Sequence, residues 1–419
     1  MKEAETLYYS PTAKTKSVPA GFMFHPLSLL FFSIILFGAL VQNLHSFTVI
    51  ISFVLALALI AKSISLAVLA KVHCRFSLPQ RHFFPLDSAI VSVEIANNKF
   101  IPLFWAHLEV PLPQGLDAGE DAGVSDRTAT QGIAFDFSLN ALSAAKFSPA
   151  VICRKRGYYP LKKLIITSGD MFGLYTQTME FMNDEALVVY PRLYPIKDLD
   201  MVSLYPSGGV SFKEQLFHDH TRTMGVRDYC TGDEFRHIHW KASARRDRLQ
   251  VKVFEPSTTG QLVLFLPAEE FGNNEELETA ICVLAALAHS MVGQGNSVGF
   301  ISNYSLMDSG GPVAVFPDSN KNKMDVLLEA FAKISSKTSE SWKIFFPSIL
   351  NQLRWGTTFV FAAAQFNETV CRSILSLRQA GYKVIVVHPG NRKDNPLYGE
   401  VSLYKYALLN GYIQCEPQQ

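Results

Sequence analysis

Charged side chains are scarce in this 419-residue sequence, and they are missing altogether from one stretch near its N-terminus. Asp, Glu, Lys and Arg make up 18% of the residues, against about a quarter in ordinary globular proteins. None of them occurs from Pro26 to Ala61. The formal net charge is only +1. Without a basic excess we expect no binding to nucleic acid.

Closely spaced cysteine pairs and the usual catalytic motifs are also missing. The six cysteines are scattered and form no C-x-x-C pair, which argues against a disulfide framework or a zinc ribbon and favours buried thiols in a reducing compartment. The sequence contains no phosphate-binding loop, serine-hydrolase elbow, HExxH motif or glycine-rich dinucleotide fingerprint. These absences favour an interaction or assembly module over an enzyme, and we expect no cofactor.

The charge-free stretch predicts two transmembrane helices. One crossing of a bilayer needs about 20 apolar residues, and this stretch is too long for one helix and has a polar break at 42–46. We therefore expect helices at 27–41 and 47–70, with the long stem of Lys62 reaching toward the headgroups. A cleaved signal peptide is one alternative, although its apolar region would be far shorter. A buried helical hairpin in a soluble core is the other.

Basic residues on both sides of this stretch predict its orientation. They are Lys2, Lys14 and Lys16 before it, and Lys71, Arg75 and Arg81 after it. Positively charged flanks stay in the cytoplasm. The large soluble remainder is therefore expected on the cytoplasmic side of the inner (cytoplasmic) membrane.

The rest of the chain predicts a multidomain α+β protein. Residues 88–95 alternate in the manner of a strand, and short strand-like runs with turn signals continue to residue 190 without a long helix. From residue 260, buried strands alternate with helices, as in a doubly wound α/β domain with a parallel sheet. The expected order is an N-terminal cytoplasmic tail (1–25), two transmembrane helices (26–71), a β-sandwich (72–190), a linker with an ordered, non-regular insert (191–259) and the α/β domain (260–419).

Within the α/β domain, strands are expected at 261–266, 297–302, 357–363 and 382–388, and helices at 275–292, 324–334 and 368–380. Glu269 and Glu270 follow the first strand, at the edge where open α/β sheets bind ligands. The two carboxylates are either a cation site or ordinary surface charge, and we favour surface charge.

One segment, 227–248, concentrates acids, arginines, two histidines and a tryptophan. A structural interpretation has Asp233 capping a turn after Gly232, an arginine paired with a carboxylate, and Trp240 anchoring the segment to a domain. A second interpretation is a protein-binding surface, since an aromatic ring among arginines is typical of binding hot spots. A third is a metal or hydrolytic site that combines Asp233 with two His-x-His pairs. These pairs are His218 with His220 and His237 with His239.

The same segment resembles the signature of the domain of unknown function 58 family. The candidate binding or interdomain residues in this motif are Arg227, Tyr229, Gly232, Asp233, Arg236, Trp240, Lys241, Ser243 and Arg245. Residues 156–159 with 168–174 are similar to a second family pattern, in which Met171 stands where the family usually has proline. Residues 97–113 and the two N-terminal transmembrane helices agree with the family as well.

The resemblance implies that the α/β domain is of the von Willebrand factor type A kind. Such domains often bind a metal through an Asp-x-Ser-x-Ser motif after their first strand. Pro267 stands at the aspartate position here, so a degenerate metal site is expected. The resemblance also implies a MoxR-type AAA+ ATPase as partner. We therefore expect a membrane-anchored, non-enzymatic scaffold or adaptor that acts with such an ATPase in assembly or maturation of other proteins. The alternative is a metal-dependent hydrolase that uses the His/Asp-rich segment 218–239.

Overall fold

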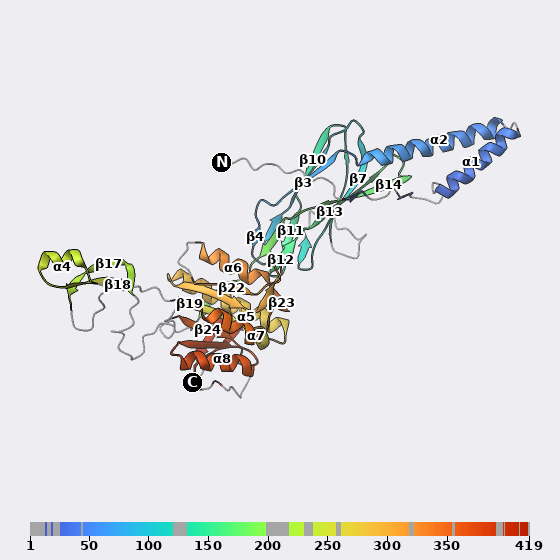
Figure 1. The fold of residues 1–419 in the computed structure, drawn as a ribbon. Coiled ribbons are helices and arrows are strands. Elements are labelled where there is room, and N and C mark those ends of the chain that lie inside the picture. Colours follow the sequence, from blue (N-terminus) through green and yellow to red (C-terminus); the bar gives the residue numbers. More distant parts are fainter. Residues whose placement is uncertain are drawn as a thin grey trace. The chain divides into compact units, whose positions relative to one another are not determined.

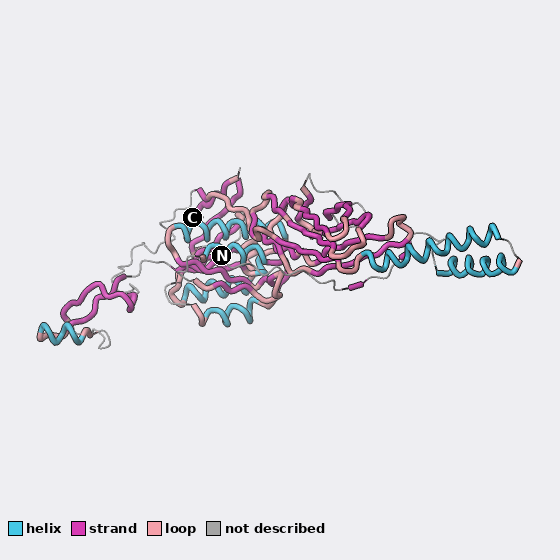
Figure 2. Tube along the Cα trace, turned by 90° about the horizontal axis from the view of Figure 1, so that it is seen from above, coloured by secondary structure: helices cyan, strands magenta, loops and turns pink. Residues whose placement is uncertain are grey.

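The computed structural model divides the chain into two units (Figures 1 and 2). One unit comprises Met1–Arg192 and Phe331–Ile334, and the other comprises Leu193–Ala330 and Ser335–Gln419. The residues described are 13–14, 18–19, 26–42, 45–119, 132–197, 218–229, 238–256, 261–317, 322–353, 357–390, 397, 399–409 and 411–417.

The first unit begins with two apolar helices, α1 (Pro26–Val41) and α2 (His45–Val68), which contact each other. Their bounds lie within two residues of the expected ones. Many of their large apolar side chains face outward, for example Leu27 at 72% and Phe53 at 69% exposure. α2 is long and apolar enough to cross a membrane, and α1 is a shorter apolar helix. Because water disfavours so much exposed apolar surface, the two helices indicate an association with a membrane.

Antiparallel strands make up most of the remainder of this unit, which we call the β domain (72–190) (Figure 2). One sheet has the order β1-β14-β13-β7-β9, with β2 beside β14, and three-stranded sheets are formed by β10-β6-β3, β5-β11-β8 and β12-β15-β4. The strands are β1 (Ala13–Lys14), β2 (Val18–Pro19), β3 (Val72–Ser77), β4 (His82–Phe83), β5 (Ser88–Ile90), β6 (Ser92–Asn97), β7 (Leu103–Pro111), β8 (Leu116–Ala118), β9 (Gly132–Leu139), β10 (Ser143–Phe147), β11 (Ala150–Cys153), β12 (Gly157–Pro160), β13 (Lys163–Gly169), β14 (Tyr175–Met182) and β15 (Ala186–Val189).

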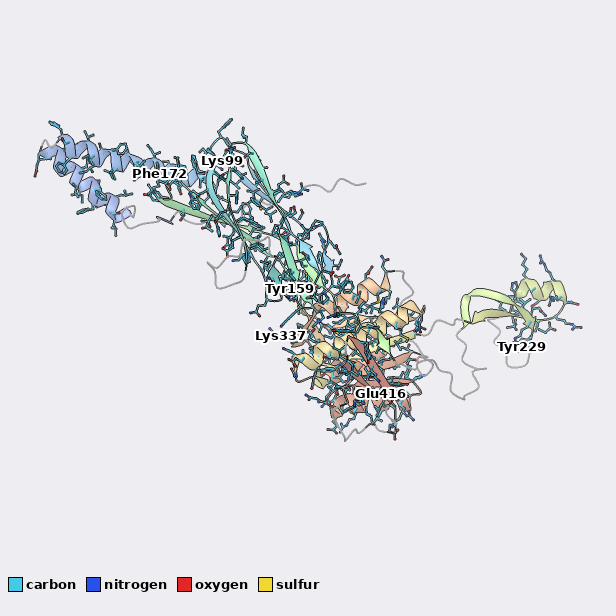
Figure 3. The ribbon with its side chains drawn as sticks, turned by 180° about the vertical axis from the view of Figure 1, so that it is seen from behind. Lys99, Tyr159, Phe172, Tyr229, Lys337 and Glu416 are labelled. Atoms are coloured by element: carbon cyan, nitrogen blue, oxygen red, sulfur yellow. The ribbon has the colours of Figure 1, made fainter. Side chains whose placement is uncertain are left out.

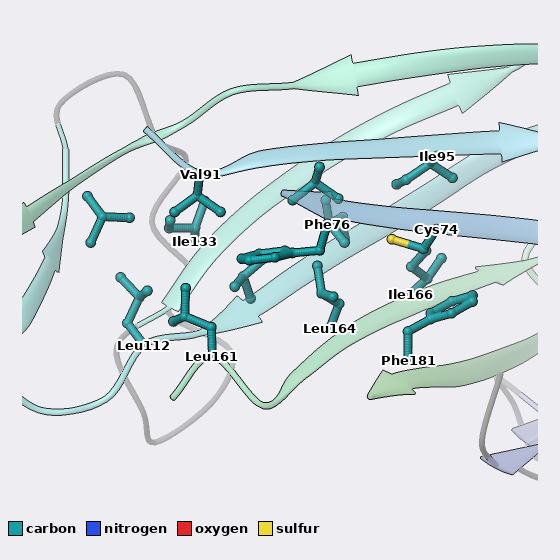
Figure 4. Close-up of a cluster of buried hydrophobic side chains, with 14 of the residues drawn as sticks. Cys74, Phe76, Val91, Ile95, Leu112, Ile133, Leu161, Leu164, Ile166 and Phe181 are labelled. Atoms are coloured by element: carbon teal, nitrogen blue, oxygen red, sulfur yellow. The ribbon is translucent and has the colours of Figure 1, made fainter. Parts of the chain in front are cut away.

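Side chains from several of these sheets meet in one core (Figure 4). The alternation in β6 explains its contribution, because Val93 and Ile95 point to the same face and are fully buried. They meet Leu164 and Ile166 of β13 and Phe181 of β14 in this core. The end of α2 joins the same core through its last residue, Val68. The helices are therefore packed onto the β domain through α2.

An eight-stranded sheet forms the centre of the second unit, in the order β16-β27-β26-β25-β24-β19-β20-β22. Pairing is parallel from β20 through β26, as expected for this domain, but β22 and β27 lie antiparallel to their neighbours β20 and β26. The sheet is therefore mixed. Its strands are β16 (Ile196–Lys197), β19 (Gln261–Leu266), β20 (Ser297–Ser302), β22 (Val313–Val315), β24 (Thr358–Ala362), β25 (Val384–His388), β26 (Ser402–Leu409) and β27 (Tyr412–Pro417).

Helices pack against this sheet. Val263 and Phe265 of β19 share a core with α7 and α8, whereas Leu264 between them points to the opposite face. α5 packs against β19 and β20. It is long and apolar enough to cross a membrane, but most of its apolar side chains are buried within this unit. The helices are α5 (Asn274–Gly293), α6 (Lys323–Lys333), α7 (Trp342–Leu350) and α8 (Glu368–Gln379), and two short strands are β21 (Tyr304–Leu306) and β23 (Ile334–Thr338).

The expectation of a non-regular insert between the domains is wrong for the residues that the structure describes there. They form two antiparallel strands, β17 (His218–Asp228) and β18 (Gln250–Pro256), and a short helix, α4 (Trp240–Arg246). These elements are not evident in the polar, histidine-rich sequence, because their apolar residues do not recur with the period of a long helix or strand.

Candidate functional site

The described residues of the charged segment and its flanks form a small module of β17, α4 and β18. In the paired strands, Arg227 lies opposite Val251 and Asp228 lies opposite Gln250. Ile238, just before α4, forms a further antiparallel bridge with Val251. Ile238 and Val251 are both nearly fully buried. Val251 therefore pairs with Arg227 on one side and with Ile238 on the other, which joins the start of α4 to strands β17 and β18.

His239 caps the N-terminus of α4. Its ring Nδ1 accepts a hydrogen bond of 3.1 Å from the backbone N–H of Ala242, which would otherwise be an open donor in the first turn. The helix ends at Asp247, which adopts a left-handed conformation with φ of 52°. Arg245 and Arg246 occupy the last turn, where positive charge favours the helix dipole.

Ser243 and Gln250 hold α4 against β18. Gln250 is fully buried, and its backbone N–H donates to the Ser243 hydroxyl at 2.9 Å. That hydroxyl donates to the carbonyl of His239 at 3.1 Å, and the His239 N–H donates to the carbonyl of Gln250 at 2.8 Å. The Gln250 side-chain amide also donates to the Asp228 carboxylate. Ser243 is therefore a structural residue of the motif, and buried Gln250 is a partner that the sequence motif did not identify.

The outer surface of α4 is apolar and basic. Trp240 is 66% exposed, and Lys241 and Arg245, one turn apart, are exposed as well. We call Trp240, Lys241 and Arg245 the α4 surface. The anchoring role considered for Trp240 therefore finds no support in its surroundings, because a buried anchor would have little exposed area. The α4 surface has instead the composition of a protein-binding hot spot.

The structure describes only some of the remaining motif residues. Arg227 is exposed and donates from Nη1 to the Asp228 carbonyl, and the Tyr229 N–H donates to the Leu249 carbonyl at 2.9 Å. Gly232, Asp233, Arg236 and His237 lie outside the described residues, as do the side chains of His218 and His220. Within the described part of the chain, no three His, Cys, Asp or Glu side chains are grouped to hold a metal ion.

A second polar cluster lies where β19 ends, in the short 3₁₀ helix η3 (Ala268–Glu270). Glu270 is fully buried, and its carboxylate accepts hydrogen bonds from the backbone N–H groups of residues 364–367 at 2.7–3.2 Å. Burial raises the pKa of Glu270, and these four donors oppose the rise because they stabilise the charged form. The carboxylate thereby fixes the loop between β24 and α8.

Glu269 connects two other loops in the same way. Its carboxylate accepts from the Asn303 side-chain amide at 2.9 and 3.2 Å and from the Trp342 backbone N–H at 2.8 Å. The side-chain oxygen Oδ1 of Asn303 in turn accepts from the backbone N–H of Ala268 at 2.8 Å. Glu269 and Glu270 are thus surrounded by N–H donors, which repel a cation. The pair is neither surface charge nor an evident cation site: it joins the loops at this edge of the sheet. Asn303, fully buried after β20, is a residue of this cluster that the sequence did not reveal.

Comparison with known proteins agrees with the motif. The family described as "Protein of unknown function DUF58" matches residues 225–333, which include Arg227, α4 and β18. Over these residues the chain is similar to the DUF58 family. A curated relative, "Uncharacterized protein YeaD" of Bacillus subtilis (strain 168), is 28% identical over 217 residues, which are 52% of this chain and 52% of the relative. The chain thus aligns with about half the length of this DUF58 relative.

Solved structures add no functional information. A GH20 exo β-N-acetylglucosaminidase from Vibrio harveyi covers 82% of this chain and 62% of its own at 11% identity, with a TM-score of 0.19. A family 123 glycoside hydrolase from Clostridium perfringens covers 75% and 68% at 8% identity, with a TM-score of 0.15. At such scores the folds do not correspond, and the likeness carries no argument about the function of this chain.

Proposed function

We propose that this protein is a membrane-anchored, non-enzymatic adaptor, and that its α4 surface binds a MoxR-type AAA+ ATPase that acts in assembly or maturation of other proteins. The exposure of Trp240 on a helix held in place by Ser243 and Gln250 carries the proposal. A large aromatic side chain presented on a fixed backbone binds a partner with little loss of conformational entropy.

The charge of α4 defines the chemistry of the partner surface. Lys241, Arg245, Arg246 and Arg248 are all exposed and lie within eight residues of one another. An acidic patch with an apolar pocket for Trp240 complements them. The identity of the partner comes from the family resemblance, which associates such proteins with MoxR-type ATPases. The α/β unit is, on the same grounds, proposed to be a von Willebrand factor type A domain whose carboxylates fix loops instead of binding a metal.

Anchoring in the membrane is the other half of the proposal. α1 and α2 serve as a pair of spanning helices, and their exposed apolar side chains meet lipid. The basic residues on both flanks orient the two ends toward the cytoplasm. The adaptor therefore works at the cytoplasmic face of the inner membrane. Reporter fusions after residue 42 and after residue 419 test this orientation: only the C-terminal fusion is expected to report a cytoplasmic location.

An affinity pull-down from detergent-solubilised membranes tests the binding surface. We expect the wild-type protein to recover a MoxR-type ATPase and Trp240→Ala to lose it. Ile344→Ala is the matched control, because Ile344 is also 66% exposed but lies on α7. Equal recovery by all three proteins, or loss with Ile344→Ala as well, contradicts a role for the α4 surface.

The alternative, a metal-dependent hydrolase, gains no specific support. His239, one of its candidate ligands, uses Nδ1 to cap α4. Metal analysis of the protein used in the pull-down separates the two functions: about one equivalent of zinc or manganese that His239→Ala removes, with α4 still folded, would favour the hydrolase.

A further inference from the structure

One end of the β domain carries the membrane helices. α2 leads directly into β3, whose first residue, Val72, pairs with the last residue of β6, Asn97. In the other sheet, Ser168 at the end of β13 pairs with Ala106 near the start of β7. Figure 3 labels Phe172 and Lys99 at this end, beside the helices, and Tyr159 at the opposite end of the β domain. The turn between β13 and β14 therefore projects from the end that faces the helical pair.

This turn, residues 170–174, presents two apolar side chains to solvent. Met171 is 61% exposed and Phe172 is 62% exposed, and we call them the hairpin tip. The single charged residue of the turn, Asp170, is buried. Exposing adjacent methionine and phenylalanine side chains to water is unfavourable, so such an apolar pair at the end of a hairpin indicates a contact surface.

The turn is fixed by Asp170. Its carboxylate accepts from the backbone N–H of Phe172 at 3.0 Å and from that of Tyr175 at 2.7 Å. The indole N–H of Trp105 donates to the Asp170 carbonyl at 2.9 Å. Gly173 takes a φ of +68°, which closes the turn. Because the backbone is held from both sides, the hairpin tip is presented in one conformation.

The hairpin also lies against the membrane helices. Both β13 and β14 contact α2. The buried residues of α2 (Ala58, Ala61, Ser65 and Val68) form one stripe along the helix, and this stripe extends past Lys62 into the charge-free part. Pro19 of β2 pairs with Tyr175, at the start of β14, and α1 begins only seven residues later, at Pro26. The hairpin tip thus lies at the end of the β domain that contacts α2.

We propose that Met171 and Phe172 insert into the boundary between the headgroups and the acyl chains of the cytoplasmic leaflet. The hairpin tip is then a second, monotopic contact with lipid, which fixes the tilt of the β domain on the membrane. This inference rests on the proposed anchoring by α1 and α2. Lipid is the occupant because the hairpin tip has no exposed charge and both strands of its hairpin contact the apolar helix α2.

Photo-crosslinking in nanodiscs of phosphatidylethanolamine and phosphatidylglycerol tests the inference with the full chain. The photoreactive amino acid p-benzoylphenylalanine replaces Phe172 in one variant and Leu86 in a control. Leu86 is also 62% exposed, but it follows β4, which lies at the end of the β domain away from α2 (Figure 1). A third variant carries the probe at Phe53 in the middle of α2. Lipid adducts are detected by intact mass, and the melting temperature of each variant confirms folding.

We expect lipid adducts at positions 53 and 172 and none at 86. Adducts at 53 with a yield at 172 no higher than at 86 would overturn the lipid contact of the hairpin tip while leaving the anchoring intact. No adducts at 53 would overturn the anchoring itself and, with it, this inference.

Discussion

The backbone N–H of Gln250 donates to the hydroxyl of Ser243 across 2.9 Å, and this bond joins α4 to β18. Both residues are buried, and the Ser243 hydroxyl itself donates a hydrogen bond to the carbonyl of His239. The exposed α4 surface depends on this arrangement, because without it a seven-residue helix is too short to be stable in water.

Ser243→Ala is expected to loosen the module. The substitution leaves the buried N–H of Gln250 without its acceptor, which costs roughly 1–3 kcal/mol. Hydrogen exchange of the Gln250 amide should therefore become faster by about one to two orders of magnitude. Arg245→Ala, which removes an exposed side chain of the same helix, should leave this exchange unchanged. Unaltered protection in Ser243→Ala would show that α4 is held by other contacts.

Substitution of two tryptophans distinguishes a structural role in the fold from a role in binding. Trp342 is fully buried against Phe265 and Phe346, so Trp342→Ala should cost about 3–5 kcal/mol and lower the melting temperature by several degrees. Trp240 is exposed, and Trp240→Ala should change the stability by no more than about 0.5 kcal/mol. Thermal unfolding of both variants measures the difference. A drop for Trp240→Ala similar to that for Trp342→Ala would mean that Trp240 is a structural anchor.

Glu270→Gln is expected to weaken the α/β unit. Both carboxylate oxygens accept backbone N–H groups, and an amide must turn its NH₂ toward one of these donors. The loss should amount to roughly 2–4 kcal/mol. Glu368→Gln, which changes an exposed carboxylate at the start of the neighbouring helix α8, is the control and should be nearly neutral. Equal melting temperatures for the two variants would contradict the loop-fixing role of Glu270.

The buried Lys99 makes the free energy of unfolding of the β domain depend on pH. Burial lowers the pKa of Lys99 from its ordinary value of 10.5 to about 8, although its ammonium donates to Asn97 at 2.7 Å. Between these pH values the unfolded chain holds a proton that the folded chain has released. The contribution of Lys99 to the free energy of unfolding therefore rises with pH in this window, by at most about 1.4 kcal/mol per pH unit.

Comparison with Lys99→Met isolates this contribution. Buried thiols such as that of Cys74 act in the opposite direction above pH 9, because burial raises the pKa of Cys74 to about 12. The quantity to measure is therefore the difference in melting temperature between wild type and Lys99→Met from pH 7.5 to 10. It should shift in favour of the wild type as the pH rises. A constant difference would show that Lys99 keeps an ordinary pKa in the folded protein.

The sequence predicts the α/β core well because its strands are short, continuous apolar runs between amphipathic helices. β19 and β20 have the expected bounds, and α5 differs by one residue at each end. The antiparallel edges were missed, since β26 and β27 mix polar and apolar residues. α7 was missed as well; it contains Pro347, a residue that ordinarily ends a helix.

The candidate site was predicted only in part. The motif residues could be located from their composition, but their roles depend on contacts between positions far apart in the sequence. Ser243 looks like any helical serine until Gln250 is placed beside it. Histidine is an uncommon N-cap, so the cap on α4 could not be read from His239. The exposure of Trp240 is not evident from the sequence either, because Ser243, three residues later on the same side of α4, is buried.

The most direct test of the α4 surface as a binding site is photo-crosslinking in living cells with p-benzoylphenylalanine in place of Trp240, beside the same probe at Ile344. We expect the probe on α4 to form a covalent adduct with a MoxR-type AAA+ ATPase, and the probe at 344 to form none. Adducts confined to the protein's own chain at position 240, or the same ATPase captured from both positions, would contradict the claim that the α4 surface is the binding site.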